Sequence, residues 1–399
     1  MKKRVMFYCQ HVLGMGHFIR SAEIVRGLSE FDVYFLNGGE LVPGFELPAA
    51  VEVINLPALR TDAGFSNLYV VEGAMSLEQI QQIRRQRLLD EYERLKPDLL
   101  VIEMFPFGRL KFASELLPLL EQARADRDRG HPVKVVCSLR DILVGKREQQ
   151  QFEIEACRIA NRYFDLLLVH SDPRFHRLEE TFSRRADLTC AVRYTGLVAP
   201  AAIPVDRDEP GSSGETILVS IGGGRVGSEL IDCAVDALDL ISDRIPHRMS
   251  IFTGPYLPEP EFQRLQSKVE GRPRIRLGRY TTSFRSQLKR ADLSISMAGY
   301  NTSLDLITTG TRAIVYPFTG NNNREQSIRA DKLRRLGLVE IIDPQELRPD
   351  CLADRMLSVL SRPKPVGAAL DLRGVEKTAL ALTELSAPDS AGAFSREDE

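Results

Sequence analysis

Residues 294–330 constrain the fold of this chain more than any other part of the sequence. Here a short β-rich run is followed by the small-residue turn Met297-Ala298-Gly299 and then by apolar residues at helical spacing. This order predicts a strand, a tight turn and the N-terminus of a helix. Such a terminus offers free backbone N–H groups and a partial positive charge, and Gly299 lets the backbone approach an anion closely. We therefore expect the turn, with Asn301 and Thr302, to bind a phosphate.

The same stretch contains a second helix opening. Residues 312–317 are predicted as the next strand, and a polar loop leads from them to a helix that opens at Glu325-Gln326. Asp305 lies about one turn into the first helix, where a carboxylate can accept hydrogen bonds from ribose hydroxyls, as acids do in nucleotide-binding folds. Helix openings at the ends of neighbouring strands define a crevice, so we expect a nucleotide to bind there.

The rest of the chain repeats the alternation of strand and helix. Polar groups gather where the predicted strands end, which is typical of an α/β protein with doubly wound parallel sheets. Residues 57–73 show no clear period and are predicted as a long loop. The other strands are predicted at 4–9, 32–37, 51–56, 98–102, 133–137, 166–169, 216–220, 249–253 and 275–277.

The length of 399 residues exceeds what one hydrophobic core usually supports, so two domains are expected. A stretch rich in Pro, Gly and Ser before residue 215 is typical of a linker. The predicted parts are an N-terminal Rossmann-like domain (1–205), a linker (206–214), a C-terminal Rossmann-like domain (215–365), a helix that is able to pack back on the N-terminal domain (366–385) and a disordered tail (386–399).

Composition excludes several classes of protein. Lys and Arg number 53 against 55 Asp and Glu, so no bulk attraction to nucleic acid is expected. The first apolar run is too short for a signal peptide, and no run reaches the length of a membrane span. The 6 cysteines stand singly, which suits free thiols in a reducing cytoplasm. No cluster of carboxylates has the spacing of a metal site, so we expect neither a metal nor another cofactor.

Three consecutive glycines, Gly222, Gly223 and Gly224, follow the predicted strand at 216–220. Glycines in a row are costly in chain entropy. They form either a tight turn without a ligand or a cradle for a diphosphate, and the cradle is favoured because the same half of the chain contains the other helix opening. Arg225 either adds positive charge to that cradle or is solvated.

A further glycine loop follows the first predicted strand and ends at Gly16-His17. A lone histidine at a helix opening is usually a cap, but an imidazole with a pKa near neutrality also suits a general base. The apolar stripe at 105–117 forms either a core or a contact with a lipid. Polar residues near strand ends, which either contact a second substrate or cap loops, are Glu103, Arg109, Arg140 and Asp141.

Taken together, these motifs resemble those of a known family. The residues Gly299, Thr302, Asp305, Gly310, Pro317-Phe318 and Glu325-Gln326 are similar to the nucleotide-sugar segment of MurG-like, family 28 type glycosyltransferases with the GT-B fold. The glycine loop at 222–224 agrees with that family, although the MurG pattern has two glutamines at the place of Glu325-Gln326. The Gly-x-Gly-His motif and Pro106-Phe107-Gly108 look nearest to bacterial predicted glycosyltransferases of unassigned acceptor.

The resemblance implies two doubly wound Rossmann-like domains facing a central cleft, with the acceptor on the N-terminal side and the nucleotide sugar on the C-terminal side. It places Asp305 on the ribose, Glu325 and Gln326 on the sugar, and the region of Tyr280 beside the base. In a related nucleotide-sugar hydrolase with the Gly-His pair followed, as here, by Arg20, the histidine that matches His17 is held to be the base.

The implied reaction moves a sugar from a nucleotide diphosphate sugar, UDP-linked by analogy, to an acceptor hydroxyl, with inversion and without a metal. The acceptor is a small molecule, a glycan or a lipid-linked molecule, and the last of these allows peripheral membrane contact. The alternatives are a nucleotide-sugar hydrolase, a nucleotide-sugar 2-epimerase, for which no matching acid cluster is found, and a non-catalytic nucleotide-sugar sensor.

Overall fold

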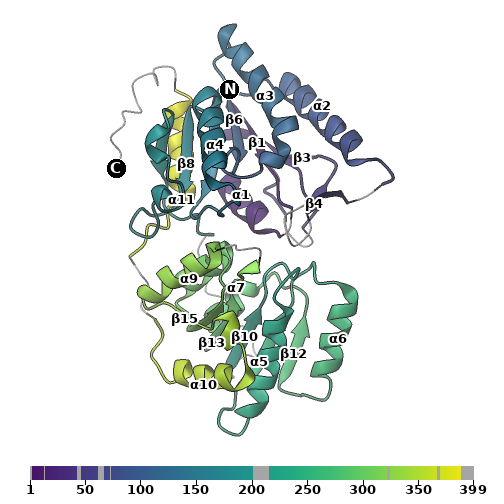
Figure 1. Ribbon diagram of the computed structural model, residues 1–399, viewed down its shortest axis with the longest axis vertical. Coiled ribbons are helices and arrows are strands. Elements are labelled where there is room, and N and C mark those ends of the chain that lie inside the picture. The colour runs from purple at the N-terminus through teal and green to yellow at the C-terminus, as the bar shows by residue number, and fades with distance from the viewer. Residues whose placement is uncertain are drawn as a thin grey trace. The chain divides into compact units, whose positions relative to one another are not determined.

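A computed structural model describes residues 2–12, 14–42, 46–61, 67–71, 73–200, 215–320, 324–365 and 369–387 (Figure 1). The predicted linker and all but the start of the predicted tail lie outside these residues. The chain divides into two compact units, one of residues 1–41, 45–199 and 370–399 and the other of residues 42–44 and 200–369. Each unit is an α/β structure around a parallel sheet, so the predicted fold class is confirmed.

The N-terminal unit contains a 7-stranded sheet in the order β3-β2-β1-β6-β7-β8-β9, in which all neighbours are parallel. Its central strands are buried on both faces, which explains why they read as continuous apolar runs in the sequence. The strands are β1 (Lys3–Cys9), β2 (Phe31–Asn37), β3 (Glu52–Asn55), β6 (Leu99–Glu103), β7 (Lys134–Arg140), β8 (Leu166–His170) and β9 (Ala191–Tyr194).

The helices of this unit are α1 (Gly16–Arg26), α2 (Leu77–Leu95), α3 (Ala113–Asp128), α4 (Gln149–Tyr163) and α11 (Gly374–Leu385). Helix α2 begins at a capping box, in which Ser76 and Gln79 satisfy each other's backbone N–H groups. Helix α11, the last of the described helices, packs against α1. The predicted loop at 57–73 is wrong in part, because β4 (Leu59–Thr61) and β5 (Leu68–Val70) pair there as an antiparallel hairpin.

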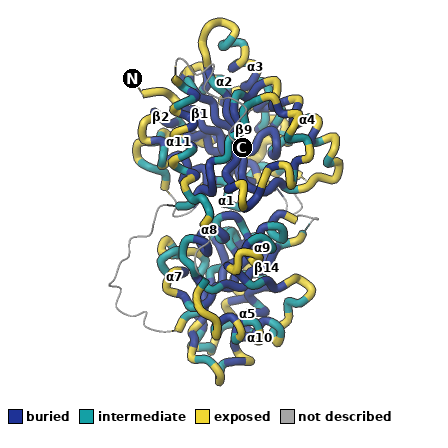
Figure 2. The backbone as a smooth tube through the Cα atoms, turned by 90° about the vertical axis from the view of Figure 1, so that its left-hand side faces the viewer, coloured by how far each residue is buried: buried dark blue, intermediate teal, exposed yellow. Residues whose placement is uncertain are grey.

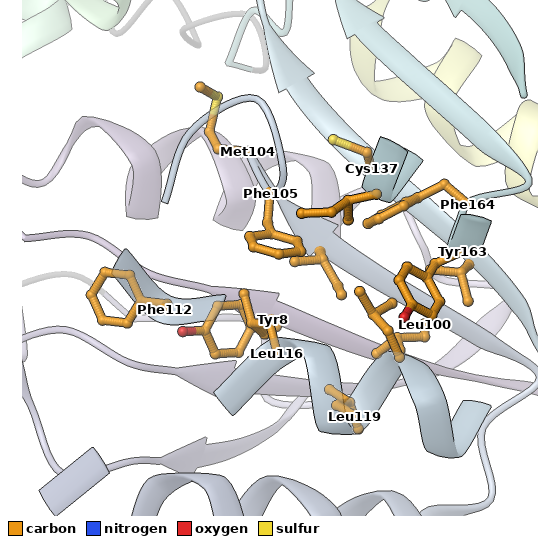
Figure 3. Packing of buried hydrophobic residues seen from close by; sticks show 14 of the residues in the cluster. Tyr8, Leu100, Met104, Phe105, Phe112, Leu116, Leu119, Cys137, Tyr163 and Phe164 are labelled. Carbon is orange, nitrogen blue, oxygen red and sulfur yellow. The ribbon is translucent and has the colours of Figure 1, made fainter. Parts of the chain in front are cut away.

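The apolar stripe after β6 belongs to the core of the N-terminal unit. Phe105, Phe112 and Leu116 are at most 2% exposed. In Figure 3 they lie among Tyr8, Leu100 and other buried side chains. Figure 2 colours the backbone by burial and shows buried strands and exposed outer turns. The core interpretation of this stripe is confirmed, and these side chains do not offer a surface to a lipid.

The C-terminal unit contains a 6-stranded parallel sheet in the order β12-β11-β10-β13-β14-β15. The strands are β10 (Thr216–Ser220), β11 (Arg248–Phe252), β12 (Ile275–Gly278), β13 (Leu293–Met297), β14 (Ala313–Tyr316) and β15 (Glu340–Ile341). The helices are α5 (Ser228–Leu240), α6 (Glu259–Val269), α7 (Phe284–Arg290), α8 (Tyr300–Thr309), α9 (Glu325–Arg335) and α10 (Pro349–Leu360). No helix within the described ranges is long and apolar enough to cross a bilayer.

Each sheet has one point where its strand order reverses, between β1 and β6 in the N-terminal unit and between β10 and β13 in the C-terminal unit. In doubly wound sheets, ligands bind outside the carboxyl ends of the strands at this switch point. The topology therefore selects the loops after β1 and β6, and those after β10 and β13, as the places to look for function.

Candidate active site

The switch point of the N-terminal unit brings together two residues that the sequence predicted separately. His17 is the second residue of α1, which follows β1, and Glu103 is the last residue of β6. The His17 Nδ1 atom lies 2.6 Å from Glu103 Oε1. Since β1 and β6 are hydrogen-bonded neighbours, the strand order itself places the two loops side by side.

The ring of His17 is held by a carboxylate and remains partly accessible. Its side chain is 18% exposed, whereas that of Glu103 is 0% exposed. The contact assigns the proton of the neutral ring to Nδ1, which donates to the carboxylate, so the lone pair is on Nε2. Burial lowers the pKa of His17 to about 3, and the charges of Arg109 and Arg140 lower it too, against the opposing effect of Glu103. His17 is therefore neutral at pH 7, with a pKa below the near-neutral value expected from the sequence.

Glu103 has a second partner on the same helix. Arg20, one turn after His17, donates from Nη2 to the Oε1 atom that also accepts from His17. Burial raises the pKa of Glu103, but His17 and Arg20 outweigh this effect and lower the pKa to about 2. The carboxylate is thus ionised, and its pairing with Arg20 is a feature that the sequence prediction missed.

Other basic residues surround this pair. Arg109 donates from Nε to the backbone oxygen of Gln10 at 2.8 Å, and Arg140 donates from Nε to that of Ile142 at 3.2 Å. Asp141, the remaining predicted residue of this group, is buried. Burial and the charges of Arg109, Arg140 and a further cation, Lys111, lower the pKa of Lys146, which the sequence prediction did not name.

A buried polar network supports the loop that leads to His17. Arg84 donates to both carboxylate oxygens of Glu115, at 2.8 and 2.7 Å, and to Gln10 Oε1 at 2.6 Å. It also donates to the backbone oxygens of Gly38 and Pro57, at 2.9 and 2.6 Å. Arg84 therefore ties α2 and α3 to the segments that follow β1, β2 and β3.

The switch point of the C-terminal unit contains the helix opening that the sequence predicted at Gly299. Helix α8 starts directly after this glycine, and its first intrahelical hydrogen bond runs from Ser303 N to Gly299 O at 2.9 Å. The N-cap residue Gly299 has no side chain with which to cap the helix, and the first turn of α8 contains no acidic residue. A Cβ atom added at Gly299 would meet only Thr302 Oγ1, at 4.0 Å. The first N–H groups of α8, which include those of Asn301 and Thr302, thus form a corner suited to an anion.

The glycines in the loop after β10 are required for different reasons. A Cβ atom at Gly224 would lie 2.3 Å from the backbone oxygen of Thr253, and one at Gly227 would lie 2.7 Å from Met297 Sδ. The packing of the chain against itself therefore requires these two glycines. Gly222 has a positive φ of 67°, and no atom of the described residues lies within 4 Å of an added Cβ, so its surroundings leave room for a ligand. The tight-turn interpretation therefore accounts for Gly224, and the diphosphate cradle stays a prediction.

Asp305 has a partner that the sequence did not reveal. Its Oδ1 atom lies 2.9 Å from Nε of Arg285, a residue of α7. This ion pair holds the carboxylate in place on α8. Tyr280, in the segment between β12 and α7, is 38% exposed. The Arg225 guanidinium lies over the ring of Tyr256, 4.8 Å from its centroid.

Glu325 and Gln326, at the start of α9, both bind other parts of the same unit. Glu325 Oε1 accepts from Nη2 of the buried Arg329 at 2.7 Å, and Arg329 also donates from Nη1 to the Ala298 oxygen at 3.0 Å. Gln326 Oε1 accepts from Phe318 N at 3.1 Å. These contacts connect the turn after β13 with the loop after β14. Arg329, which makes the connection, was not predicted as a functional residue.

The predicted site residues therefore form two groups, one in each unit, at or after the carboxyl ends of the parallel strands. The N-terminal group contains Gly16, His17, Glu103, Arg109, Arg140 and Asp141. The C-terminal group contains Gly222, Gly223, Gly224, Arg225, Tyr280, Gly299, Asn301, Thr302, Asp305, Glu325 and Gln326.

Two doubly wound, Rossmann-like sheets with polar groups at both switch points define the GT-B class of fold. Solved structures of other proteins are similar to this structure along nearly the whole chain. A UDP-GlcNAc 2-epimerase from Methanocaldococcus jannaschii has a TM-score of 0.59 at 12% identity, covering 96% of this chain and 99% of its own. The spinosyn forosaminyltransferase SpnP has a TM-score of 0.60 at 14% identity, covering 97% and 100%. MurG of Acinetobacter baumannii has a TM-score of 0.54 at 15% identity, covering 95% of each chain. At these identities the likeness shows the fold.

The match to a family model lies in the C-terminal half of the chain. Residues 217–369 match the Glycosyltransferase family 28 C-terminal domain, which confirms the MurG-like, family 28 resemblance. A curated relative from Agrobacterium fabrum, UDP-N-acetylglucosamine--N-acetylmuramyl-(pentapeptide) pyrophosphoryl-undecaprenol N-acetylglucosamine transferase, is 26% identical over 165 residues. This match covers 40% of the chain and 42% of the relative, so it spans less than half the length of that protein.

Proposed function

We propose that this chain is a glycosyltransferase that moves a sugar from a nucleotide diphosphate sugar to an acceptor hydroxyl, with His17 as the base. The observation that carries the proposal is the hydrogen bond between His17 and the ionised Glu103, in a chain whose other unit matches the family 28 domain. A neutral, partly exposed imidazole held by a carboxylate is the arrangement that general-base catalysis needs.

The donor belongs at the C-terminal switch point. The N-terminus of α8 and the backbone at Gly222 bind the diphosphate, and Asp305 accepts hydrogen bonds from the ribose hydroxyls. Tyr280 borders the base, while Glu325 and Gln326 order the loops beside the sugar. The curated relative's name includes UDP-N-acetylglucosamine, which supports a UDP-linked donor.

The acceptor hydroxyl attacks the anomeric carbon while the bond to the diphosphate breaks, through an oxocarbenium-like state. His17 takes the hydroxyl proton on Nε2, and Glu103 stabilises the imidazolium that forms. Negative charge grows on the departing diphosphate, where the N–H groups of α8 stabilise it. Direct attack from the opposite side inverts the anomeric centre.

The N-terminal switch point also indicates the chemistry of the acceptor. Arg109, Arg140 and Lys146 place positive charge around His17. Such charge favours an acceptor with an anionic group near the reacting hydroxyl, whether it is a small molecule, a glycan or a lipid-linked molecule.

The test compares the wild type with His17→Gln on a panel of nucleotide sugars, with His131→Gln as the control because His131 is exposed and outside both groups. Binding is measured by calorimetry, and release of the nucleoside diphosphate is measured with and without candidate acceptors. We expect His17→Gln to reduce turnover by about two to four orders of magnitude with donor affinity unchanged. Full turnover in His17→Gln would refute the role of His17, and equal sugar release without any acceptor would identify a hydrolase instead.

A further inference from the structure

Arg20 occupies an unusual position for an arginine. Its side chain is 1% exposed, and it lies three residues after His17 on α1, so both side chains project from the same face of the helix. Both donate to one oxygen atom, Oε1 of Glu103, while the buried Oε2 has no hydrogen-bond partner among the described residues. The imidazole of His17 and the guanidinium of Arg20 therefore both bind the charged carboxylate through the same oxygen atom.

The other groups that face this pair come from neighbouring strands and loops. Arg109 and Arg140, the latter followed by the buried Asp141, act on His17 through their charges, whereas Arg20 donates a hydrogen bond to Glu103 directly. Two thiols and two histidines also interact with Glu103, and burial lowers the pKa of one of these histidines, His11, to about 4. Burial raises the pKa of the thiols of Cys9 on β1 and Cys137 on β7, and it lowers that of His170 on β8 to about 3.

We propose that Arg20 is the positioning residue of the His17–Glu103 pair, and that its charge keeps Glu103 ionised without drawing a proton onto His17. A buried carboxylate without a cationic partner is costly, and it lowers this cost by holding a proton. His17 is the group beside Glu103 that would take this proton, because its ring already shares Oε1 with Arg20. A protonated ring has no lone pair with which to accept another proton. Arg20 prevents this outcome because the Arg20–Glu103 pair is already neutral.

The test follows the protonation of His17 directly and does not depend on any assay of activity. The protein is labelled with 15N-histidine, and its ring signals are followed by NMR between pH 5 and 8.5, with His17 identified by the signals that His17→Gln lacks. In the wild type we expect the neutral ring with its proton on Nδ1 throughout this range. In Arg20→Gln we expect the titration midpoint of His17 to rise, because a Glu103 carboxylate without its guanidinium partner favours the protonated ring.

Two further variants separate charge from shape. Arg20→Lys keeps the charge, and His17 should stay neutral as in the wild type. Arg26→Gln makes the same change on the same helix, but Arg26 pairs with Glu23 and not with Glu103, so the titration of His17 should not change. An imidazolium at pH 7 in the wild type, an unshifted His17 in Arg20→Gln, or a shifted His17 in Arg20→Lys would each overturn the proposal. If Arg20→Gln does not fold, the protonation of His17 in the wild type and in Arg20→Lys still tests the proposal.

A kinetic measurement adds a second readout that rests on the proposed function. With a donor that turns over, the acidic limb of the kcat/KM profile of Arg20→Gln should move upward with the midpoint seen by NMR, and Arg20→Lys should restore the wild-type profile. A uniform loss of kcat/KM at every pH in Arg20→Gln would indicate a merely structural role and contradict the proposal. If no donor turns over, the proposed function fails, while the NMR result still stands or falls separately.

Discussion

Replacing Glu115 by glutamine should strongly destabilise the N-terminal unit, because it leaves Arg84 as an unpaired buried cation. Both side chains are at most 1% exposed, and Glu115 accepts from Arg84 and from the Tyr8 hydroxyl. The amide of a glutamine would place a donor against these donors. Breaking a buried ion pair in this way typically costs about 3–5 kcal/mol. With a urea dependence of about 2 kcal/mol per molar, the unfolding midpoint should fall by about 2 M.

The chain contains no tryptophan, so unfolding is best followed by circular dichroism and calorimetry. We expect the unfolding transition of the N-terminal unit to shift to lower urea concentration and that of the C-terminal unit to stay unchanged. The reverse change provides a sharper contrast: Arg84→Met leaves a carboxylate that can be neutralised by a proton, whereas arginine cannot lose its charge. The cost of Arg84→Met should therefore shrink between pH 8 and 5.5, and that of Glu115→Gln should not. A loss below about 1 kcal/mol for Glu115→Gln would refute the reasoning.

Two other predictions concern pH and backbone packing. Burial lowers the pKa values of the three histidines His11, His17 and His170 to about 4, 3 and 3. The unfolded chain then binds more protons below pH 6.5, so stability should fall by about 2 kcal/mol per histidine at pH 5. Thermal unfolding at pH 7 and 5 checks this, and an unchanged melting temperature would contradict it. Gly224→Ala should destabilise the C-terminal unit by about 1–3 kcal/mol, because the new Cβ meets the Thr253 oxygen and the φ is positive. Wild-type stability in a urea titration would show that this loop is not packed as described.

Much of the fold could be predicted because buried parallel strands leave continuous apolar runs in the sequence. Strand β13, the turn at Gly299 and helix α8 follow one another as the pattern indicated. The strands that were missed are short. Strand β9 is only half-buried, and β4 and β5 are three residues each, so neither leaves a period long enough to recognise.

The candidate site was predictable as a set of residues but not as a set of contacts. His17 and Glu103 are 86 positions apart, and only the order of the strands makes them neighbours. The rule that ligands bind where the strand order reverses could have paired them, because β1 and β6 flank that point. No pattern in the sequence showed that Arg285 binds Asp305 or that Arg329 reaches Ala298, since such partners are chosen by packing.

The central claim is that the C-terminal unit binds a nucleotide diphosphate sugar through Asp305. Titration calorimetry with UDP-sugars on the wild type and on Asp305→Asn tests it directly. Asp331→Asn is the matched control, because Asp331 lies on α9 and pairs with Arg334. We predict binding to the wild type and the control, and an affinity about tenfold to a hundredfold lower in Asp305→Asn, since hydrogen bonds to a charged group contribute about 1.5–3 kcal/mol. Failure of every nucleotide sugar to bind the wild type, or equal affinity in Asp305→Asn, would contradict the account.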